Sequence, residues 1–140
     1  MKRITTMRLT TKSTFATTVM LDLALHEGQG PVSLQSVARR HGVSQSYLEG
    51  LFASLKQAGL VRSVRGPGGG YELARSLAHI SLADISRAVE PALEAEDEAE
   101  VPSAASALTA SLYQAYSRQL LKYLEETRLR EAMPAGAQLA

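Results

Sequence analysis

The chain has 140 residues, of which 45% are hydrophobic and 21% are charged, and its formal net charge is +1. This length suffices for one domain with its own core and an appended element. No apolar run approaches the roughly 20 residues needed to cross a bilayer, and the absence of cysteine excludes disulfides, thiolate nucleophiles and cysteine-ligated metal centres. We expect a cytoplasmic protein without a membrane partner.

The charge is divided unevenly along the chain. Residues 1–75 contain ten Lys or Arg against four Asp or Glu, whereas residues 76–140 contain five against ten. A polyanion is attracted by a local positive surface, even where the total charge is close to zero. The N-terminal part is therefore the candidate nucleic-acid-binding part.

Three helices are predicted in the N-terminal part. The first covers about residues 11–26 and carries an apolar stripe at helical spacing. The second follows a capping Ser33 and ends at Gly42. The third begins at Ser44 or Ser46, and a tight turn joins it to the second helix. Two helices joined in this way form a helix-turn-helix pattern, in which the third helix of the chain is the candidate recognition helix.

A glycine-rich hairpin follows the third helix. Residues 62–73 predict two short strands around a turn of four glycines and one proline, with Arg62 and Arg65 leading into the tip. Glycine has no Cβ, so such a loop can approach a phosphate or enter a narrow groove. A nucleotide-binding P-loop is the poorer interpretation, because the Lys-Ser or Lys-Thr pair is missing and a strand follows the loop. The hairpin is typical of the wing of a winged helix.

The C-terminal part predicts two helices separated by an acidic loop. Ser81 and Asp84 form a capping box for a short helix over about residues 82–89. Residues 94–100 contain five carboxylates and predict a mobile, solvated loop. A long helix is predicted over about residues 107–133. Together these elements predict a mainly α fold with a small β-hairpin.

Candidate DNA contacts lie on the third helix, the hairpin and several basic positions. Side chains in the first turns of a recognition helix reach base edges in the major groove, where tyrosine contacts a thymine methyl group and glutamate accepts from cytosine. Basic side chains neutralise phosphates. The candidates are Arg8, Lys12, Arg39, Arg40, Ser44, Ser46, Tyr47, Glu49, Arg62, Arg65, Gly66 and Gly68. The alternative for each is an ordinary solvated side chain or a helix cap.

The long C-terminal helix predicts dimerisation. Its apolar stripe needs a covering surface, and a second copy of the chain supplies one. The stripe consists of Leu108, Leu112, Tyr116, Leu120, Tyr123 and Leu124. The alternative is packing of this helix against its own domain.

The sequence gives no sign of catalysis or of a resident cofactor. The three histidines are scattered, and no cysteine or paired carboxylate motif accompanies them. We expect neither a metal site nor an enzyme.

Four segments resemble the bacterial winged-helix regulators of the IscR and NsrR type, namely residues 7–12, 20–25, 46–49 and 64–71. The resemblance is clear over residues 7–90 and looser over the long helix. It implies a homodimer that represses or activates transcription, with the third helix in the major groove and the wing arginine in the minor groove. By position, it assigns these roles to Ser46, Tyr47, Glu49 and Arg65.

The resemblance also implies a domain organisation and breaks at the sensor. It implies a winged helix-turn-helix DNA-binding domain over residues 7–90, an acidic sensor-type loop over 91–106 and a dimerisation helix over 107–133. Many members hold an iron–sulfur cluster on three cysteines in this loop, and this chain has none. Without cysteine, the remaining possibilities for regulation are a small-molecule ligand, a partner protein or constitutive DNA binding.

A second explanation for the missing cysteines is replacement by alanine in a cluster-sensing regulator. The conceivable positions are Ala95, Ala104, Ala105, Ala107 and Ala110. The loop is acidic and lacks the glycines that cluster loops use, which favours a naturally cluster-free protein.

The expected function is that of a homodimeric repressor that binds a pseudo-palindromic operator in double-stranded DNA. The alternative from another class is a protein-interaction adaptor, in which the winged helix docks a partner protein and the basic surface is incidental. The two differ in their response to salt, because only DNA binding should weaken log-linearly as salt rises.

Overall fold

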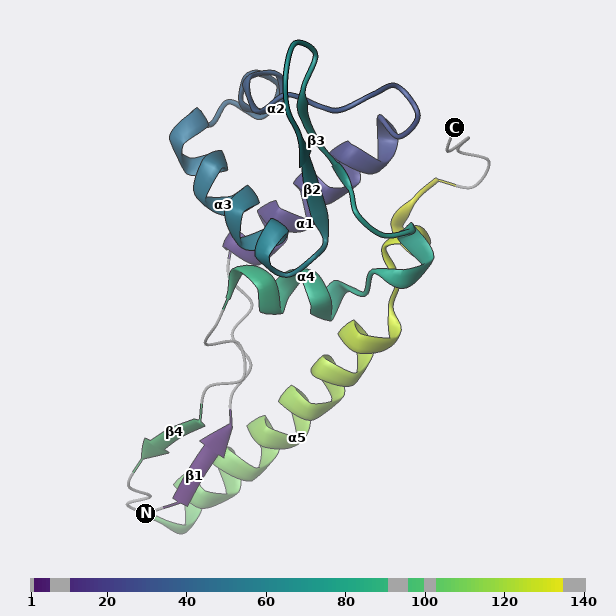
Figure 1. Ribbon diagram of the computed structural model, residues 1–140. Helices are drawn as coiled ribbons and strands as arrows, with labels where there is room; N and C mark the ends of the chain where they lie inside the picture. The colour runs from purple at the N-terminus through teal and green to yellow at the C-terminus, as the bar shows by residue number, and fades with distance from the viewer. Residues whose placement is uncertain (1, 6–10, 91–95, 100–102, 135–140) are drawn as a thin grey trace.

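The computed structural model describes residues 2–5, 11–90, 96–99 and 103–134 (Figure 1). It confirms the mainly α fold with a winged-helix hairpin and a long C-terminal helix. The helices are α1 (Thr11–Leu25), α2 (Leu34–His41), α3 (Gln45–Gln57), α4 (Leu82–Val89) and α5 (Ala104–Glu126), with 3-10 helices at Leu77–His79 and Leu129–Ala132. The strands are β1 (Lys2–Thr5), β2 (Val61–Val64), β3 (Gly70–Leu73) and β4 (Glu96–Ala99). No helix in these described ranges is both long and apolar enough to span a membrane.

Side-chain caps start three of these helices as the sequence predicts. Ser33 caps α2, and Ser44 rather than Ser46 caps α3, where its hydroxyl accepts from the Tyr47 backbone N–H. The Ser81 hydroxyl accepts from the Asp84 N–H at 3.0 Å, and the Asp84 carboxylate accepts from the Ser81 N–H at 3.0 Å. These reciprocal bonds satisfy backbone donors that have no partner inside α4.

The core of the winged helix lies between α1, α3 and α4. α3 contributes Leu48, Phe52 and Leu55, which are fully buried, and α1 contributes Met20. Ile85 of α4 closes the core from the other side. The spacing of the buried side chains on α3 follows the helical period, so one face of α3 is committed to the core and the opposite face is left to solvent.

The wing is fixed to the segment between α1 and α2. β2 and β3 pair antiparallel, and Val32 adds a bridge to Tyr71 through two backbone hydrogen bonds of 2.8 Å each. The backbones approach so closely that a Cβ on Gly70 would lie 2.2 Å from the Val32 carbonyl oxygen. Only glycine permits this approach, which connects the wing mechanically to the start of α2.

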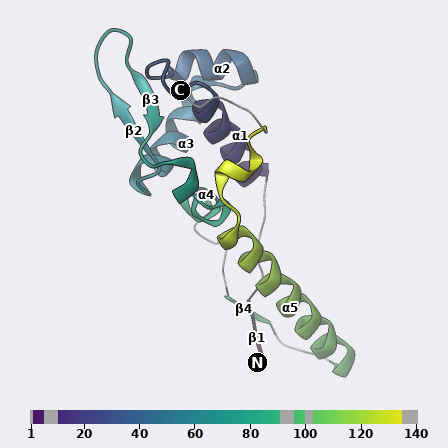
Figure 2. The ribbon, with the colours of Figure 1, turned by 90° about the vertical axis from the view of Figure 1, so that its right-hand side faces the viewer.

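The long helix differs from its predicted range. It begins at Ala104, after a cap at Ser103, and ends at Glu126 instead of continuing to residue 133. It stops because the chain turns back onto the domain. The N–H of Leu129 donates to the Ile80 carbonyl at 2.7 Å, and the Leu129 side chain is fully buried. Two views show α5 projecting from the winged helix as an arm (Figures 1 and 2).

The acidic loop also needs a correction. The prediction of a solvated loop is wrong for residues 96–99, which form β4 and pair antiparallel with β1. In the register of this pairing Arg3 lies opposite Glu98 and Ile4 opposite Asp97. β1 also contacts α5. The remainder of the predicted 94–100 loop lies outside the described residues.

Candidate nucleic-acid interface

The exposed face of α3 carries the three predicted base-contacting residues. Ser46, Tyr47 and Glu49 are exposed, and 42% of the Tyr47 residue surface is accessible. The capping role of Ser44 leaves the Ser46 hydroxyl outside the cap. The helix-turn-helix therefore presents three polar side chains of different hydrogen-bonding character within its first turns, as a reader of base edges requires.

The turn that aims α3 depends on Gly42. This residue has φ 64° and ψ 36°, a left-handed conformation at the C-terminus of α2. The backbone N–H groups of Gly42 and Val43 both donate to the Ala38 carbonyl oxygen in the last turn of α2. A left-handed glycine at this place ends one helix and redirects the chain into the next.

Arg65 and the tip glycines form an exposed end of the hairpin. Arg65, Gly66 and Gly68 are all exposed, and Cβ atoms built on the two glycines would meet no heavy atom within 4 Å. Their positive φ angles of 97° and 75° explain the choice of glycine. Within the described part of the chain, no ion pair or hydrogen bond holds the Arg65 guanidinium.

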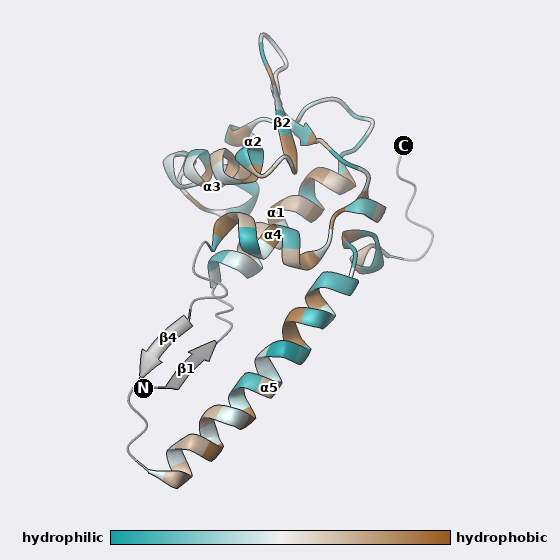
Figure 3. Cartoon of the chain, turned by 60° about the horizontal axis from the view of Figure 1, so that its bottom comes forward, coloured by the Kyte–Doolittle hydropathy of each residue, from teal (hydrophilic) through white to brown (hydrophobic). Residues whose placement is uncertain are grey.

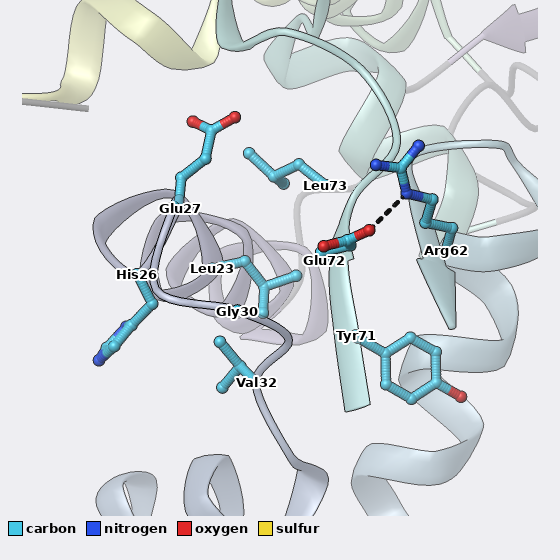
Figure 4. A pocket seen from close by; sticks show the side chains of 10 residues that line it. Leu23, His26, Glu27, Gly30, Val32, Arg62, Tyr71, Glu72 and Leu73 are labelled. Carbon is cyan, nitrogen blue, oxygen red and sulfur yellow. Dashed lines mark hydrogen bonds and ion pairs between the residues drawn. The ribbon is translucent and has the colours of Figure 1, made fainter. Parts of the chain in front are cut away.

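Arg62 differs from Arg65 because it has a partner across the hairpin. Its Nε donates to the Glu72 carboxylate at 2.7 Å (Figure 4). Beside this pair, between the end of α1 and the wing, lies a cavity of about 150 Å³ that Leu23 and Val32 help to line. Such a volume is below the roughly 300 Å³ typical of small-molecule pockets, so the cavity does not by itself identify an effector site.

The remaining predicted cations fall into three situations. Lys12 on α1 and Arg39 on α2 are exposed. Arg8 lies outside the described residues. Arg40 makes a two-pronged ion pair with Asp22 of α1, with Nε to Oδ2 at 3.1 Å and Nη2 to Oδ1 at 3.0 Å. The guanidinium of Arg40 is thus engaged inside the protein, although its side chain keeps 38% of its accessible surface.

Asp22 is the centre of a cluster that sequence reasoning missed. Its side chain is 7% exposed and also accepts from His41 Nε2 at 2.7 Å. His26 Nδ1 lies 3.0 Å from the carboxylate and is hydrogen-bonded to the Asp22 backbone carbonyl at 2.8 Å. Burial acts to raise the pKa of Asp22, but the hydrogen bonds from Arg40 and His41, with the charges of Arg40 and His26, outweigh it and lower the pKa below 3.8. A lone carboxylate within the apolar run of residues 19–25 was the available signal.

The lowered pKa of Asp22 predicts a specific acid sensitivity. The ionised carboxylate contributes stability that is present above its unfolded-state pKa of about 3.8 and is lost as the pH falls through the lower pKa of the folded protein. Urea midpoints of the wild type should therefore fall below pH 3.8 more steeply than those of Asp22→Asn. Parallel midpoint curves for the two proteins would contradict this assignment.

Aromatic contacts join the Asp22 cluster to α3. The His41 ring meets the Phe15 ring at a centroid distance of 5.8 Å and an interplanar angle of 88°. The Phe15 ring in turn lies 5.9 Å from the ring of Tyr47. Contacts of this edge-on and tilted kind are favourable between aromatic rings. Tyr47 is therefore in contact with a side chain of α1 as well as being exposed on α3.

The apolar stripe of α5 is mostly directed away from its own protomer. Leu108, Leu112, Tyr116 and Tyr123 are 68%, 71%, 63% and 61% exposed. Hydrophobic segments are visible along the arm in Figure 3. Leu124 departs from the expected stripe, because it is only 7% exposed within the protomer, where α5 contacts α4. The buried residues of α5 are Ala110, Ser117 and Leu124, which are spaced seven residues apart and face its own chain.

Comparison with known proteins agrees with this geometry. The sequence model of the Rrf2 family, described as an iron-dependent transcriptional regulator, matches residues 9–135. The Azotobacter vinelandii protein ORF2 is 57% identical over 88 residues, which cover 63% of this chain and 54% of that protein. The chain therefore spans about half the length of this relative. The HTH-type transcriptional regulator IscR of Vibrio cholerae is 42% identical over 130 residues, which cover 91% of this chain and 75% of IscR.

Solved structures give the same result. IscR of T. potens superposes with a TM-score of 0.72 at 36% identity, covering 95% of this chain and 93% of that chain. CymR, the global cysteine regulator of B. subtilis, superposes with a TM-score of 0.74 at 33% identity, covering 89% of this chain and 95% of that chain. These relatives are regulators and not enzymes. The chain belongs to the Rrf2 family of helix-turn-helix transcriptional regulators.

Proposed function

We propose that this regulator is a homodimeric repressor that binds a pseudo-palindromic operator, with α3 in the major groove and Arg65 in a flanking minor groove. The observation that carries the proposal is the exposed face of α3. Ser46, Tyr47 and Glu49 lie on it, while the opposite face of the helix is buried in the core. A rigidly seated helix with polar side chains in its first turns suits base readout.

Gly50 supports the docking of this face against DNA. A Cβ at this position would meet no heavy atom of the chain within 4 Å, so internal packing does not require glycine here. Glycine inside a helix costs about 0.5–1 kcal/mol relative to alanine. Because no side chain projects from α3 at this position, base edges or the DNA backbone could approach the helix closely next to Glu49.

The outward face of α5 supports the homodimer. Its exposed leucines and tyrosines form an apolar surface on an arm that projects from the domain (Figure 3). A second copy presents the same surface, as a two-fold interface requires. Two recognition helices held about 34 Å apart would reach successive major grooves of a palindrome.

The proposed operator binding does not use a cysteine-ligated cluster. The family description names iron, but the donor set of this chain does not fit such a cluster because the sequence has no cysteine. In the described ranges, His, Asp and Glu side chains form no group of three that could hold a metal ion. We propose a small molecule or a partner protein as the effector in a cytoplasmic setting.

Selection of bound sequences from random duplex DNA tests this function. Purified protein, with no metal or reductant added, should enrich one palindromic sequence. Binding to that duplex should weaken log-linearly with salt, at a slope of about −0.9 per phosphate contact. No enrichment, together with salt-insensitive capture of a protein partner, would favour the adaptor instead. In vitro transcription from a promoter that overlaps the operator then separates repression from activation.

Arg65→Ala is expected to weaken operator binding by about 1–3 kcal/mol, because it removes the exposed guanidinium at the wing tip. Equilibrium binding to the selected duplex measures the loss. Arg130→Ala, which removes the same charge from an exposed position in the C-terminal 3-10 helix, is the matched control. Equal losses of affinity in both variants would mean that Arg65 contributes only its charge and makes no specific groove contact.

A further inference from the structure

The Asp22 cluster lies at the joint of the helix-turn-helix. Asp22 belongs to α1, and two of its partners, Arg40 and His41, are the last two residues of α2. The next residue is the left-handed Gly42, after which the chain enters α3. One buried carboxylate therefore holds the point from which the recognition helix departs.

The geometry of these contacts fixes orientation. The Asp22 carboxylate receives Nε and Nη2 of Arg40 on different oxygens, so the planar guanidinium and the planar carboxylate are aligned side by side. An ionised carboxylate only accepts, so His41 Nε2 is the donor in the 2.7 Å contact, which sets the direction of its ring. The two parallel hydrogen bonds are satisfied only when the guanidinium and the carboxylate keep this mutual orientation.

The ring of His41 transmits this orientation to the surface of α3. Its edge-on contact with Phe15, and the contact of Phe15 with Tyr47, form a continuous path from the buried carboxylate to an exposed residue in the first turn of α3. The hydrogen bond from the Tyr47 N–H to Ser44 holds the backbone at the same place. The position of the Tyr47 ring thus depends on how the Asp22, Arg40 and His41 side chains are arranged.

The same cluster neutralises a cation next to the proposed DNA surface. Arg40 follows the exposed Arg39, and both were candidates for phosphate contacts. The Asp22 carboxylate engages two of the three guanidinium nitrogens of Arg40. An arginine held in this way adds less to counterion release than a free one does.

We propose that Asp22 is a positioning residue for DNA recognition: it orients Tyr47 through His41 and Phe15, and it withholds Arg40 from the phosphates. This inference rests on the proposed operator binding. It predicts that the cluster sets the ratio between specific and non-specific affinity, and that its main effect is not on the absolute strength of DNA binding.

Asp22→Asn tests the proposal, because it keeps the size of the side chain and removes its charge. The wild type and the variant are titrated with the selected operator and with a random duplex of equal length over a salt series. We expect operator affinity to fall about tenfold. The random duplex should bind equally or more tightly, and the salt slope should steepen by about 0.9 for each phosphate contact that the released Arg40 makes.

The control for a purely structural effect is Asp84→Asn. It removes a carboxylate from the capping box of α4, which is not part of the Asp22 cluster. This variant should lower the melting temperature and leave the affinity ratio unchanged. An Asp22→Asn protein that loses both affinities equally, or that keeps the wild-type ratio, overturns the proposal.

Two further variants keep the proposal testable if Asp22→Asn does not fold. Arg40→Gln should leave the affinity for the random duplex and its salt slope unchanged. If Arg40 contacted a phosphate in the wild type, the substitution would instead weaken this binding and make the salt slope shallower. Phe15→Leu should lower the affinity ratio without changing the salt slope. A wild type that shows no sequence preference would refute the proposed function, whereas a wild type with preference and variants without effect would refute only the role of Asp22.

Discussion

The double variant Leu108→Glu/Leu112→Glu is expected to be a folded monomer that has lost operator binding. Both side chains are mostly exposed in the protomer, at 68% and 71%, so glutamate at these positions costs the isolated fold little. In the proposed dimer the same positions are buried, and four carboxylates would have to be desolvated close together. Sedimentation velocity should report a species near 15.0 kDa in place of one twice that mass.

Loss of the dimer should have a large effect on DNA affinity. A dimer binds its second half-site as an intramolecular event, and this advantage is worth about 10²–10⁴ in affinity. The monomer should therefore bind the full operator at least about a hundredfold more weakly, with affinity close to that for a single half-site. A circular dichroism spectrum equal to that of the wild type would show that the fold is retained.

Leu25→Glu is the matched control for the double variant. Leu25 is also an exposed leucine, with 55% of its surface accessible, but it lies at the end of α1. It should leave both the sedimentation profile and operator binding unchanged. If the α5 variant keeps the sedimentation profile of the wild type, the outward face of α5 is not the dimer interface.

Local sequence signals predicted most of the winged helix. Ser33 before α2, Ser81 with Asp84 before α4, and Gly42 in the turn act within a few residues of one another, so their roles are visible in the sequence alone. The buried face of α3 follows from its helical spacing in the same way. Tyr47 and Glu49 are exposed because they lie outside that buried face.

Long-range pairings explain what the sequence did not predict. β1 and β4 are separated by about ninety residues, and each is too short to be identified without its partner. Asp22 and its α2 partners are 18 and 19 residues apart. The ionised side chain in an apolar helix was a signal that a partner exists, but helical periodicity does not say which cation approaches it.

The end of α5 is the same kind of case. Nothing between Glu126 and Met133 breaks a helix as glycine or proline would, so periodicity alone extends α5 to residue 133. The chain leaves the helix because Leu129 finds a fully buried site and Thr127 accepts from the Leu82 N–H at 2.9 Å. Tertiary burial here outweighs local helix propensity.

Leu129→Ala is expected to destabilise the protein by about 2–5 kcal/mol, the range for truncation of a fully buried leucine. The side chain closes the core from the C-terminal side, and its backbone N–H is bonded to Ile80 at 2.7 Å. Urea unfolding at a fixed protein concentration measures the change, since dimerisation would make the midpoint concentration-dependent.

The matched control for this substitution is Leu25→Ala, which removes the same atoms from a residue that is 55% exposed and should cost less than about 0.5 kcal/mol. Hydrogen exchange adds a local readout, because the amides of Leu82 and Leu129 bridge the start of α4 and the C-terminal segment. Both amides should lose protection in Leu129→Ala, and α3 amides that exchange only by global unfolding should lose protection by the free energy that urea unfolding measures. A loss of stability no larger than that of the control would mean that the C-terminal segment is not part of the cooperative fold, and that α5 ends for a reason other than the burial of Leu129.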